Sequence, residues 1–89
     1  MKKDDQKQNS QLQVTLRSKE KVLYNGVANT ISSENERGPF DILPEHANFI
    51  SLIHNYIIVD HGLVTEQSFQ LEKGVMYVVS NKIDVYIGI

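Results

Sequence analysis

The sequence predicts an all-β domain, a small β-sandwich or flattened barrel. Apolar residues alternate with polar residues near both ends of the chain, and turn-forming residues recur at short intervals between the apolar stretches. No stretch of helical period is long enough to compete. About eight short strands at this spacing are typical of a small sandwich or barrel.

Strands are expected at residues 12–17, 21–24, 27–33, 49–53, 56–59, 63–71, 75–79 and 83–89. In the first strand, Leu12, Val14 and Leu16 alternate with polar residues, which places them on one face. The second strand is expected to end at Asn25-Gly26, because both residue types tolerate positive φ. A polar loop at 34–37 follows the third strand.

The run from Gly38 to Ala47 contains both prolines of the chain, Pro39 and Pro44. Proline fixes its own φ, lacks an N–H and restricts the preceding residue, so the run predicts a shaped loop, a short strand and a sharp turn. Such loops on a rigid β scaffold often form binding surfaces. The next two strands are expected to be separate, or one bent pair around His54-Asn55.

In the second half, a turn is expected at 60–62, and Lys73-Gly74 is expected to end the strand that begins at residue 63. The stretch 75–79 is nearly all apolar, which predicts a strand covered on both faces. A tight turn at 80–82 leads to the last strand, which alternates again. The residues expected to point inward from the terminal strands are Leu12, Val14, Leu16, Ile83, Val85 and Ile87.

Composition limits the function classes. The 89 residues predict one domain at 12–89, preceded by a disordered polar tail at 1–11. A net charge of −2 and aromatic residues without interleaved basic residues argue against nucleic-acid binding. No apolar stretch reaches the ~20 residues of a spanning helix, so no membrane insertion is expected. The absence of cysteine favours a reducing compartment.

The sequence offers little enzyme chemistry. It has no phosphate-binding glycine motif and no nucleophile elbow. The histidines His46, His54 and His61 are not spaced as common metal-ligand pairs. Asp41, Glu45 and His46 could form an acid–base group only if they face one another in a cleft, and ordinary turn roles are favoured. No catalytic residue, metal or cofactor is therefore predicted.

The central run, Gly-Pro-Phe-Asp-Ile-Leu-Pro-Glu-His-Ala at 38–47, resembles the signature loop Gly-x-Phe-Gly-Ile-Leu-Pro-x-His-Ala of the epsilon subunit of F-type ATP synthases. The segments 24–26, 74–78 and 81–85 resemble the family's aromatic-x-Gly step and its closing strands. The similarity covers residues 12–89 in the right order.

The resemblance implies the family's N-terminal β-sandwich of about ten strands. It implies a non-catalytic rotor subunit of the central stalk, peripheral to the cytoplasmic face of the membrane. This subunit would link the gamma subunit to the c-ring and so couple proton transport to ATP synthesis.

The resemblance also assigns residues to two contacts. The residues of the c-ring-facing loop are Gly38, Pro39, Phe40, Asp41, Glu45 and His46. All of them except Gly38 are expected at one end of the sandwich, near ring loops that usually carry arginine and glutamine. The gamma-facing residues are Ser18, Ile50 and Ser51.

Three positions depart from the family pattern, since Asp41, Glu45 and Lys73 stand where glycine is usual. The family's C-terminal helical hairpin has no counterpart in the sequence, so its restraint of hydrolysis and its ATP binding are not carried over. Two alternatives stay open. The chain could be a stand-alone β-sandwich module that binds another protein, or a small enzyme that uses Asp41, Glu45 and His46.

Overall fold

The structure, a computed structural model, describes residues 11–88. In this part of the chain it contains seven strands and no helix, which confirms the predicted all-β class. The strands are β1 (Leu12–Arg17), β2 (Val22–Ala28), β3 (Ile31–Asn35), β4 (Gly38–Ile42), β5 (Phe49–Val59), β6 (Gln67–Val79) and β7 (Lys82–Ile87). The predicted tail, apart from Gln11, lies outside the described residues.

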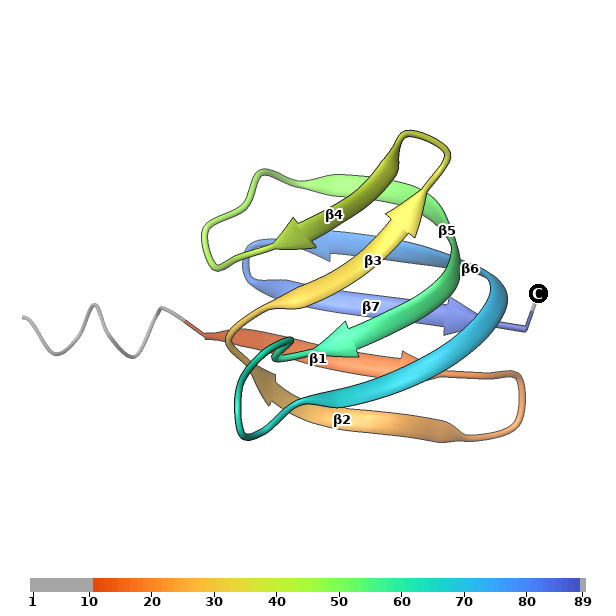
Figure 1. The fold of residues 1–89 in the computed structure, drawn as a ribbon, viewed down its shortest axis with the longest axis horizontal. Helices are drawn as coiled ribbons and strands as arrows, with labels where there is room; N and C mark the ends of the chain where they lie inside the picture. Colours follow the sequence, from red (N-terminus) through yellow and green to blue (C-terminus); the bar gives the residue numbers. More distant parts are fainter. Residues whose placement is uncertain (1–10, 89) are drawn as a thin grey trace, which may run out of the picture.

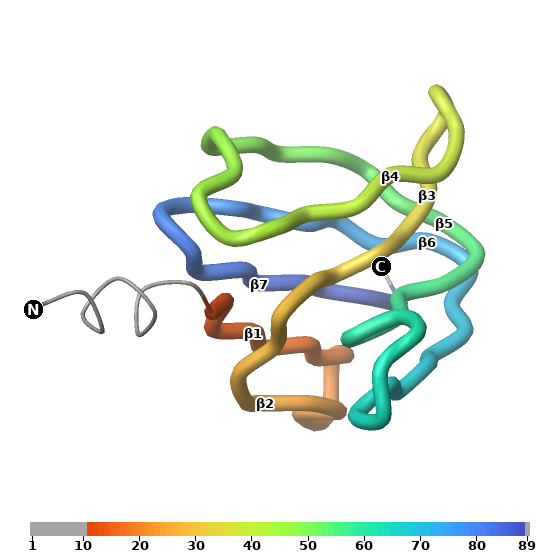
Figure 2. Tube along the Cα trace, turned by 60° about the vertical axis from the view of Figure 1, so that its left-hand side comes forward, coloured from red at the N-terminus to blue at the C-terminus, as the bar shows by residue number. Residues whose placement is uncertain are grey.

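All seven strands belong to one sheet that curls into two layers (Figures 1 and 2). The strand order is β2-β1-β7-β6-β5-β3-β4. The β1–β7 pair is parallel, and every other neighbouring pair is antiparallel. We call the layer of β2, β1, β7 and the adjoining halves of β6 and β5 the first layer. The second layer holds the other halves of β5 and β6 together with β3 and β4.

The two layers are joined by bends in β5 and β6. The register shifts between His54 and Asn55, because His54 pairs with Lys73 while Asn55 pairs with Leu71 and so leaves Glu72 as an extra residue. Asn55 has a φ of 77°, a conformation that asparagine tolerates better than most residues. A bulge of this kind bends a strand and increases its twist. The predicted bent pair at 49–59 is therefore one continuous strand, and the total is seven strands rather than eight or ten.

The core lies between the layers and follows the predicted alternation. Five of the six residues expected to point inward are at most 1% exposed, and Ile87 is half-buried against the same cluster. The buried hydrophobic residues are Leu12, Val14, Leu16, Ala28, Ile31, Ile42, Ile53, Ile57, Val59, Met76, Val78, Ile83 and Val85. The inward face predicted for the terminal strands is confirmed.

The turn predicted at Asn25-Gly26 is wrong. Asn25 pairs with Thr15, and Gly26 pairs with Val14, so both lie inside β2. Neither residue has positive φ. Pairing with β1 outweighs the local turn preference, and β2 continues to Ala28.

Two expectations about β6 are also wrong. Lys73-Gly74 does not end the strand, because Gly74 pairs with Ile53 and Ile87. A Cβ at Gly74 would lie 2.8 Å from the backbone oxygen of Tyr86, so glycine is required there by close packing. The stretch Val75–Val79 is not covered on both faces, since Tyr77 and Val79 are exposed. The strand also begins at Gln67 rather than at residue 63.

Asp60 joins the end of β5 to the connection between β2 and β3. Its Oδ1 accepts hydrogen bonds from the backbone N–H groups of Asn29 (2.6 Å) and Thr30 (3.3 Å), and its Oδ2 accepts one from the Thr65 hydroxyl (2.6 Å). Asp60 as a whole is 4% exposed. Burial alone would raise the pKa of Asp60, but these hydrogen bonds stabilise the charged form and lower the pKa below its usual value of 3.8.

Replacement of Val85 by alanine tests the register of β7. The Val85→Ala variant loses buried methyl groups and leaves a small cavity, so we expect the free energy of unfolding to fall by about 1–3 kcal/mol. Lys82→Ala, at an exposed position of the same strand, is the control and should change stability by less than about 0.5 kcal/mol. Chemical denaturation measures both. A Val85→Ala protein as stable as the wild type would contradict the register.

We call the hydrogen bonds that the Asp60 carboxylate accepts from Asn29, Thr30 and Thr65 the Asp60 clamp, and neutralisation of Asp60 tests it. A pKa lowered by folding adds stability above the unfolded-state value of 3.8, and this stability is lost as the pH falls through the lower folded-state pKa. We expect Asp60→Asn to cost about 1–3 kcal/mol at pH 7, because charged hydrogen bonds are lost. The difference from wild type should shrink below about pH 4. Glu72→Gln removes an exposed carboxylate and is the control. A difference that does not change between pH 7 and pH 3 would refute the ionised clamp.

Candidate functional site

The structure separates the predicted c-ring-facing residues into two groups. Gly38 to Asp41 belong to β4, which starts at the β3–β4 turn, where Gly38 pairs with Asn35. Glu45 and His46 follow the far end of β4, beside the turn between β6 and β7. The six residues therefore do not form one continuous loop, although Phe40 of β4 and His46 of the following loop both pack edge-on against Phe49 at 5.5 Å. The cause is pairing with β3, which extends the first half of the run into a strand (Figure 1).

The two carboxylates that replace glycines have separate partners. Asp41 accepts a hydrogen bond of 2.6 Å from the Ser32 hydroxyl on the neighbouring strand. Glu45 has a φ of 71°, donates its backbone N–H to Asn81 Oδ1 at 2.6 Å and accepts from Asn81 Nδ2 at 3.3 Å. Asp41 thus ties β4 to β3, and Glu45 ties its loop to the β6–β7 turn.

The third member of the possible acid–base group, His46, packs edge-on against Phe49, and its Nδ1 lies 2.7 Å from the backbone oxygen of Ala47. Glu45 and His46 line the same cavity beside the β6–β7 turn, whereas Asp41 does not line it and is bonded to Ser32 on β3. Among residues 11–88, no group of three His, Cys, Asp or Glu side chains could hold a metal ion. The same residues include no helix long and apolar enough to cross a membrane.

The predicted gamma-facing residues are also divided. Ile50 and Ser51 are neighbours on β5, where Ile50 is 68% exposed and Ser51 accepts a hydrogen bond from Asn35 Nδ2 at 3.1 Å. Ser18 lies in the turn between β1 and β2, where its backbone N–H bonds to Lys21. Three strand positions of the sheet, β1, β7 and β6, separate β2 from β5.

Sequence reasoning missed an apolar surface on the outside of the first layer. Ile50 lies opposite Tyr77, Leu52 opposite Val75, and Val75 opposite Tyr86, so these side chains form one patch across three strands. We call it the outer apolar face, and it comprises Ile50, Leu52, Val75, Tyr77, Val79 and Tyr86. Its signal was the apolar run at 75–79, which predicts a strand covered on both faces. Contiguous exposed apolar patches are typical of interaction sites.

Aromatic contacts fix the side chains on the β6–β7 side of the outer apolar face. The rings of Tyr77 and Tyr86 meet edge-on at 6.0 Å between centroids, and the Arg17 guanidinium lies 5.6 Å from the centroid of Tyr86. Such contacts hold large side chains in place without covering them. The face is therefore preorganised, which lowers the entropy cost of binding a partner.

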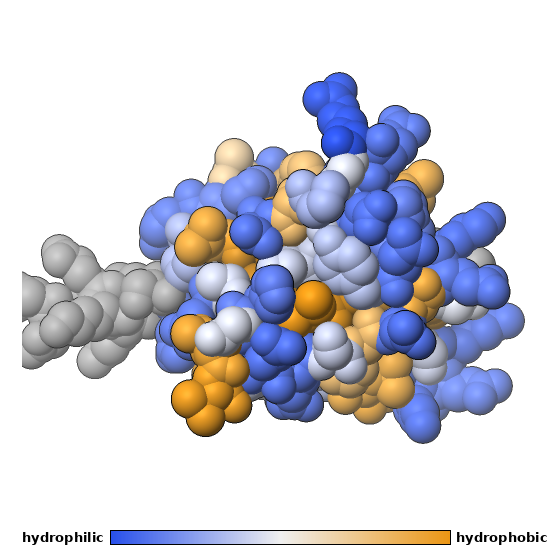
Figure 3. Space-filling view, in the orientation of Figure 1, coloured by the Kyte–Doolittle hydropathy of each residue, from blue (hydrophilic) through white to orange (hydrophobic). Residues whose placement is uncertain are grey.

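Figure 3 shows the hydropathy of two other parts of the surface, the β3–β4 turn and the β5–β6 loop. Hydrophilic side chains project over the β3–β4 turn, where Glu36 and Arg37 are exposed. A small apolar group lies over the loop that connects β5 to β6, where Leu63 and Val64 are exposed. The polar turn and the outer apolar face are thus distinct surfaces of the same sandwich.

Comparisons with known proteins match this β-sandwich. The family described as "ATP synthase, Delta/Epsilon chain, beta-sandwich domain" matches residues 11–87. The chain belongs to this family, as the resemblance of the central run predicted. A comparison with the curated proteins found no match.

Solved structures share the fold. A chain of the Euglena gracilis mitochondrial ATP synthase (OSCP/F1/c-ring, rotational state 1) matches with a TM-score of 0.79 and 14% identity, over 88% of this chain and 51% of that one. A chain of the Tetrahymena thermophila mitochondrial ATP synthase (central stalk/c-ring) matches with a TM-score of 0.69 and 14% identity, over 85% and 62%. The chain thus spans about half to three fifths of the length of these relatives.

Proposed function

We propose that this chain is a non-catalytic rotor subunit of the central stalk of an F-type ATP synthase. In this role it contacts the gamma subunit and the c-ring on the cytoplasmic face of the membrane, and it couples proton transport to ATP synthesis. The observation that carries the proposal is the family match over residues 11–87. Asp41 does not line the cavity that Glu45 and His46 share, so the three residues do not face one another in one cleft, which supports a role without catalysis.

The construction of the sandwich is suited to a subunit that transmits force between two partners. Because β5 and β6 each run through both layers, the layers are joined by continuous backbone and not by side-chain contacts alone. The space between them is filled by a cluster of fully buried residues. Close-packed interiors have low compressibility and transmit strain. A force applied at one surface would therefore reach another surface with little deformation.

For the gamma contact we propose the outer apolar face, which includes the predicted Ile50 and adjoins Ser51. Leu52 is 73% exposed and lies beside Ile50 on this face. Covering exposed apolar side chains with a partner is favourable because it removes them from water, and tyrosine, present on this face as Tyr77 and Tyr86, is enriched among the residues that dominate interface binding energy. Ser18, which lies in the β1–β2 turn, belongs at most to the periphery of this contact.

A binding measurement with purified gamma subunit tests this contact. We expect Leu52→Asp to weaken the interaction by at least about tenfold, because it places a carboxylate in the apolar interface. Val64→Asp changes an equally apolar residue on the β5–β6 loop and should bind like the wild type. Equal affinity of the wild type and Leu52→Asp would rule out this face. Wild-type protein that binds neither the gamma subunit nor the c-ring would favour the stand-alone module.

For the c-ring contact the two separated groups give two candidate surfaces, the β4 strand with Asp41 and the loop with Glu45. We propose that at least one of these carboxylates pairs with an arginine of a ring loop. A desolvated pair of this kind favours docking and register more than raw affinity. Each carboxylate also has an internal partner, so a substitution must separate loss of charge from loss of the internal bond.

Charge reversal tests this pairing. Asp41→Lys or Glu45→Lys should weaken binding to purified c-ring at low salt, where charge effects are largest, and should leave gamma binding and folding intact. Asp41→Asn and Glu45→Gln retain an acceptor for the internal bond and remove only the charge, so they should show a smaller loss in the same direction. If both reversals bind the ring as the wild type does, the electrostatic contact is wrong.

A further inference from the structure

Arg17, the last residue of β1, borders the outer apolar face. It pairs with Tyr86 of β7, and paired residues of neighbouring strands project to the same side of a sheet. The guanidinium carbon lies over the Tyr86 ring, 5.6 Å from its centroid, and that ring meets the Tyr77 ring edge-on. Cation–π attraction holds a guanidinium in such a position. The cation therefore has a fixed place beside apolar side chains.

The guanidinium of Arg17 has neither a hydrogen-bond acceptor nor an ion pair among residues 11–88. Its Nε is buried, and a buried N–H is a group that folded proteins normally satisfy. The two terminal nitrogens are not buried in this way, so they are the donors that a group from outside the chain can reach. The outer apolar face is thus bordered by a cation whose hydrogen-bonding capacity is unused.

The chain's own carboxylates do not neutralise this cation. Asp84 pairs with Thr15, two residues before Arg17, so it is diagonal to Arg17 on the same face of the sheet. Asp84 is half-buried in an open cavity that Tyr77 and Tyr86 also line, and Arg17 does not line that cavity. Within the part of the chain that the structure describes, Arg17 forms no ion pair with Asp84 or with Glu20 of the β1–β2 turn.

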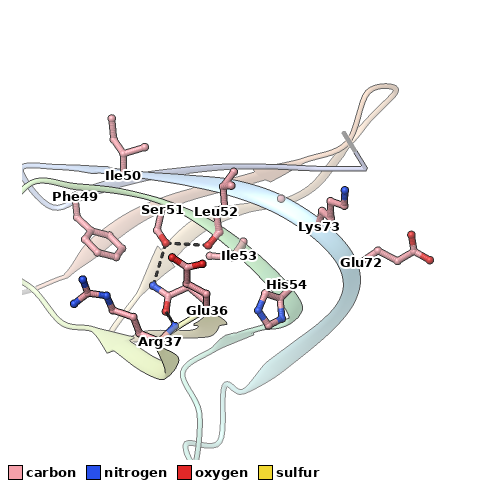
Figure 4. A pocket seen from close by; sticks show the side chains of 12 residues that line it. Glu36, Arg37, Phe49, Ile50, Ser51, Leu52, Ile53, His54, Glu72 and Lys73 are labelled. Carbon is pink, nitrogen blue, oxygen red and sulfur yellow. Dashed lines mark hydrogen bonds between the residues drawn. The ribbon is translucent and has the colours of Figure 1, made fainter.

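A partner that covers the outer apolar face must also cover Arg17. Figure 4 shows the β5 side of this face, where Leu52 projects from the strand on the side opposite to Phe49. Leu52 lies opposite Val75 of β6, and Val75 lies opposite Tyr86 of β7. Because the Arg17 guanidinium lies over the Tyr86 ring, a partner seated on Leu52 and Tyr86 removes water from the guanidinium as well.

A guanidinium that loses its water requires a counter-charge, because a buried charge without a partner is strongly unfavourable. Carboxylates match arginine best, since they can accept two parallel N–H hydrogen bonds from its planar fork. We propose that Arg17 anchors a carboxylate of the partner that covers the outer apolar face. An acidic side chain of the partner accepts hydrogen bonds from the terminal nitrogens of Arg17, while apolar side chains of the partner cover the rest of the face.

The identification of this partner as the gamma subunit rests on the proposed function. The apolar side chains of the face favour any partner that removes them from water. The anchor at Arg17 restricts the choice to a partner that carries an acidic residue at the matching place. Charge complementarity of this kind fixes register and accelerates association more than it increases raw affinity. Arg17 is thus the residue that gives an otherwise apolar contact its specificity.

Binding of purified gamma subunit to variants of Arg17 tests the anchor. We expect Arg17→Gln to weaken binding several-fold, and Arg17→Glu to weaken it by at least about tenfold because two carboxylates then meet. The affinity of the wild type should fall as the salt concentration rises, and that of Arg17→Gln should depend less on salt. Val64→Glu lowers the net charge by as much as Arg17→Gln, but on the exposed β5–β6 loop, and should bind like the wild type. Circular dichroism and thermal melting confirm that each variant is folded.

Asp84→Asn separates a carboxylate of the partner from one of the same chain. If the partner supplies the carboxylate, Asp84→Asn should bind the gamma subunit as tightly as the wild type or more tightly, because it removes a negative charge that faces an acidic partner. If Arg17 instead turns to Asp84 when it is covered, Asp84→Asn should weaken binding as much as Arg17→Gln does. The double variant should then be no weaker than either single variant, and that result would overturn the proposal.

Two further outcomes would also overturn the proposal. Equal affinity of the wild type and Arg17→Glu, with binding still weakened by Leu52→Asp, would remove the anchor and leave the gamma contact in place. A wild type that does not bind the gamma subunit at any salt concentration would contradict the proposed function as well. Sedimentation with vesicles of phosphatidylcholine and phosphatidylserine then completes the test. Binding of the wild type to these vesicles and not to the gamma subunit, with loss in Arg17→Glu, would assign the cation to an anionic lipid surface.

Discussion

The fold depends on one constraint, which is that a single sheet must bury its apolar face against itself. The bends in β5 and β6 near His54-Asn55 satisfy this constraint. They allow each long strand to serve both layers, so Met76 and Val78 in one half face residues such as Ile57 and Val59 across the same core. A straight β5 could not contribute core residues to both layers. The left-handed conformation of Asn55 is therefore a structural requirement of the sandwich.

The bends also create the surfaces on which the proposed functions depend. Where β5 turns away into the second layer, its first half loses β3 as a neighbour and becomes an edge. The outward residues of that half adjoin those of β6 and β7, which gives the outer apolar face. The Asp60 clamp closes the far end of β5 onto the β2–β3 connection. The proposed partner surfaces thus result from the same bends that enclose the core, and they lie on strands of the closely packed sandwich.

The sequence was sufficient where a property depends on residues close together in the chain. The alternation in β1 and β7 identified their buried residues, and Ser80 and Asn81 form the predicted turn with positive φ. The central run identified the family. The sequence was insufficient where long-range pairing decides. Asn25-Gly26 has a local turn preference that pairing with β1 overrides. In the run at 75–79, Met76 and Val78 are buried whereas Tyr77 and Val79 are exposed, and sequence cannot distinguish an apolar face that the same chain covers from one that it leaves exposed.

The central claim is that this sandwich sits in the rotor between the gamma subunit and the c-ring. A density map of ATP synthase isolated through an affinity tag on this chain tests it directly. We expect one copy of the sandwich in the central stalk, with the outer apolar face against gamma and either β4 or the loop at Glu45 against the ring. A map in which the chain is absent from the stalk, or in which the outer apolar face is exposed to solvent, would contradict the account.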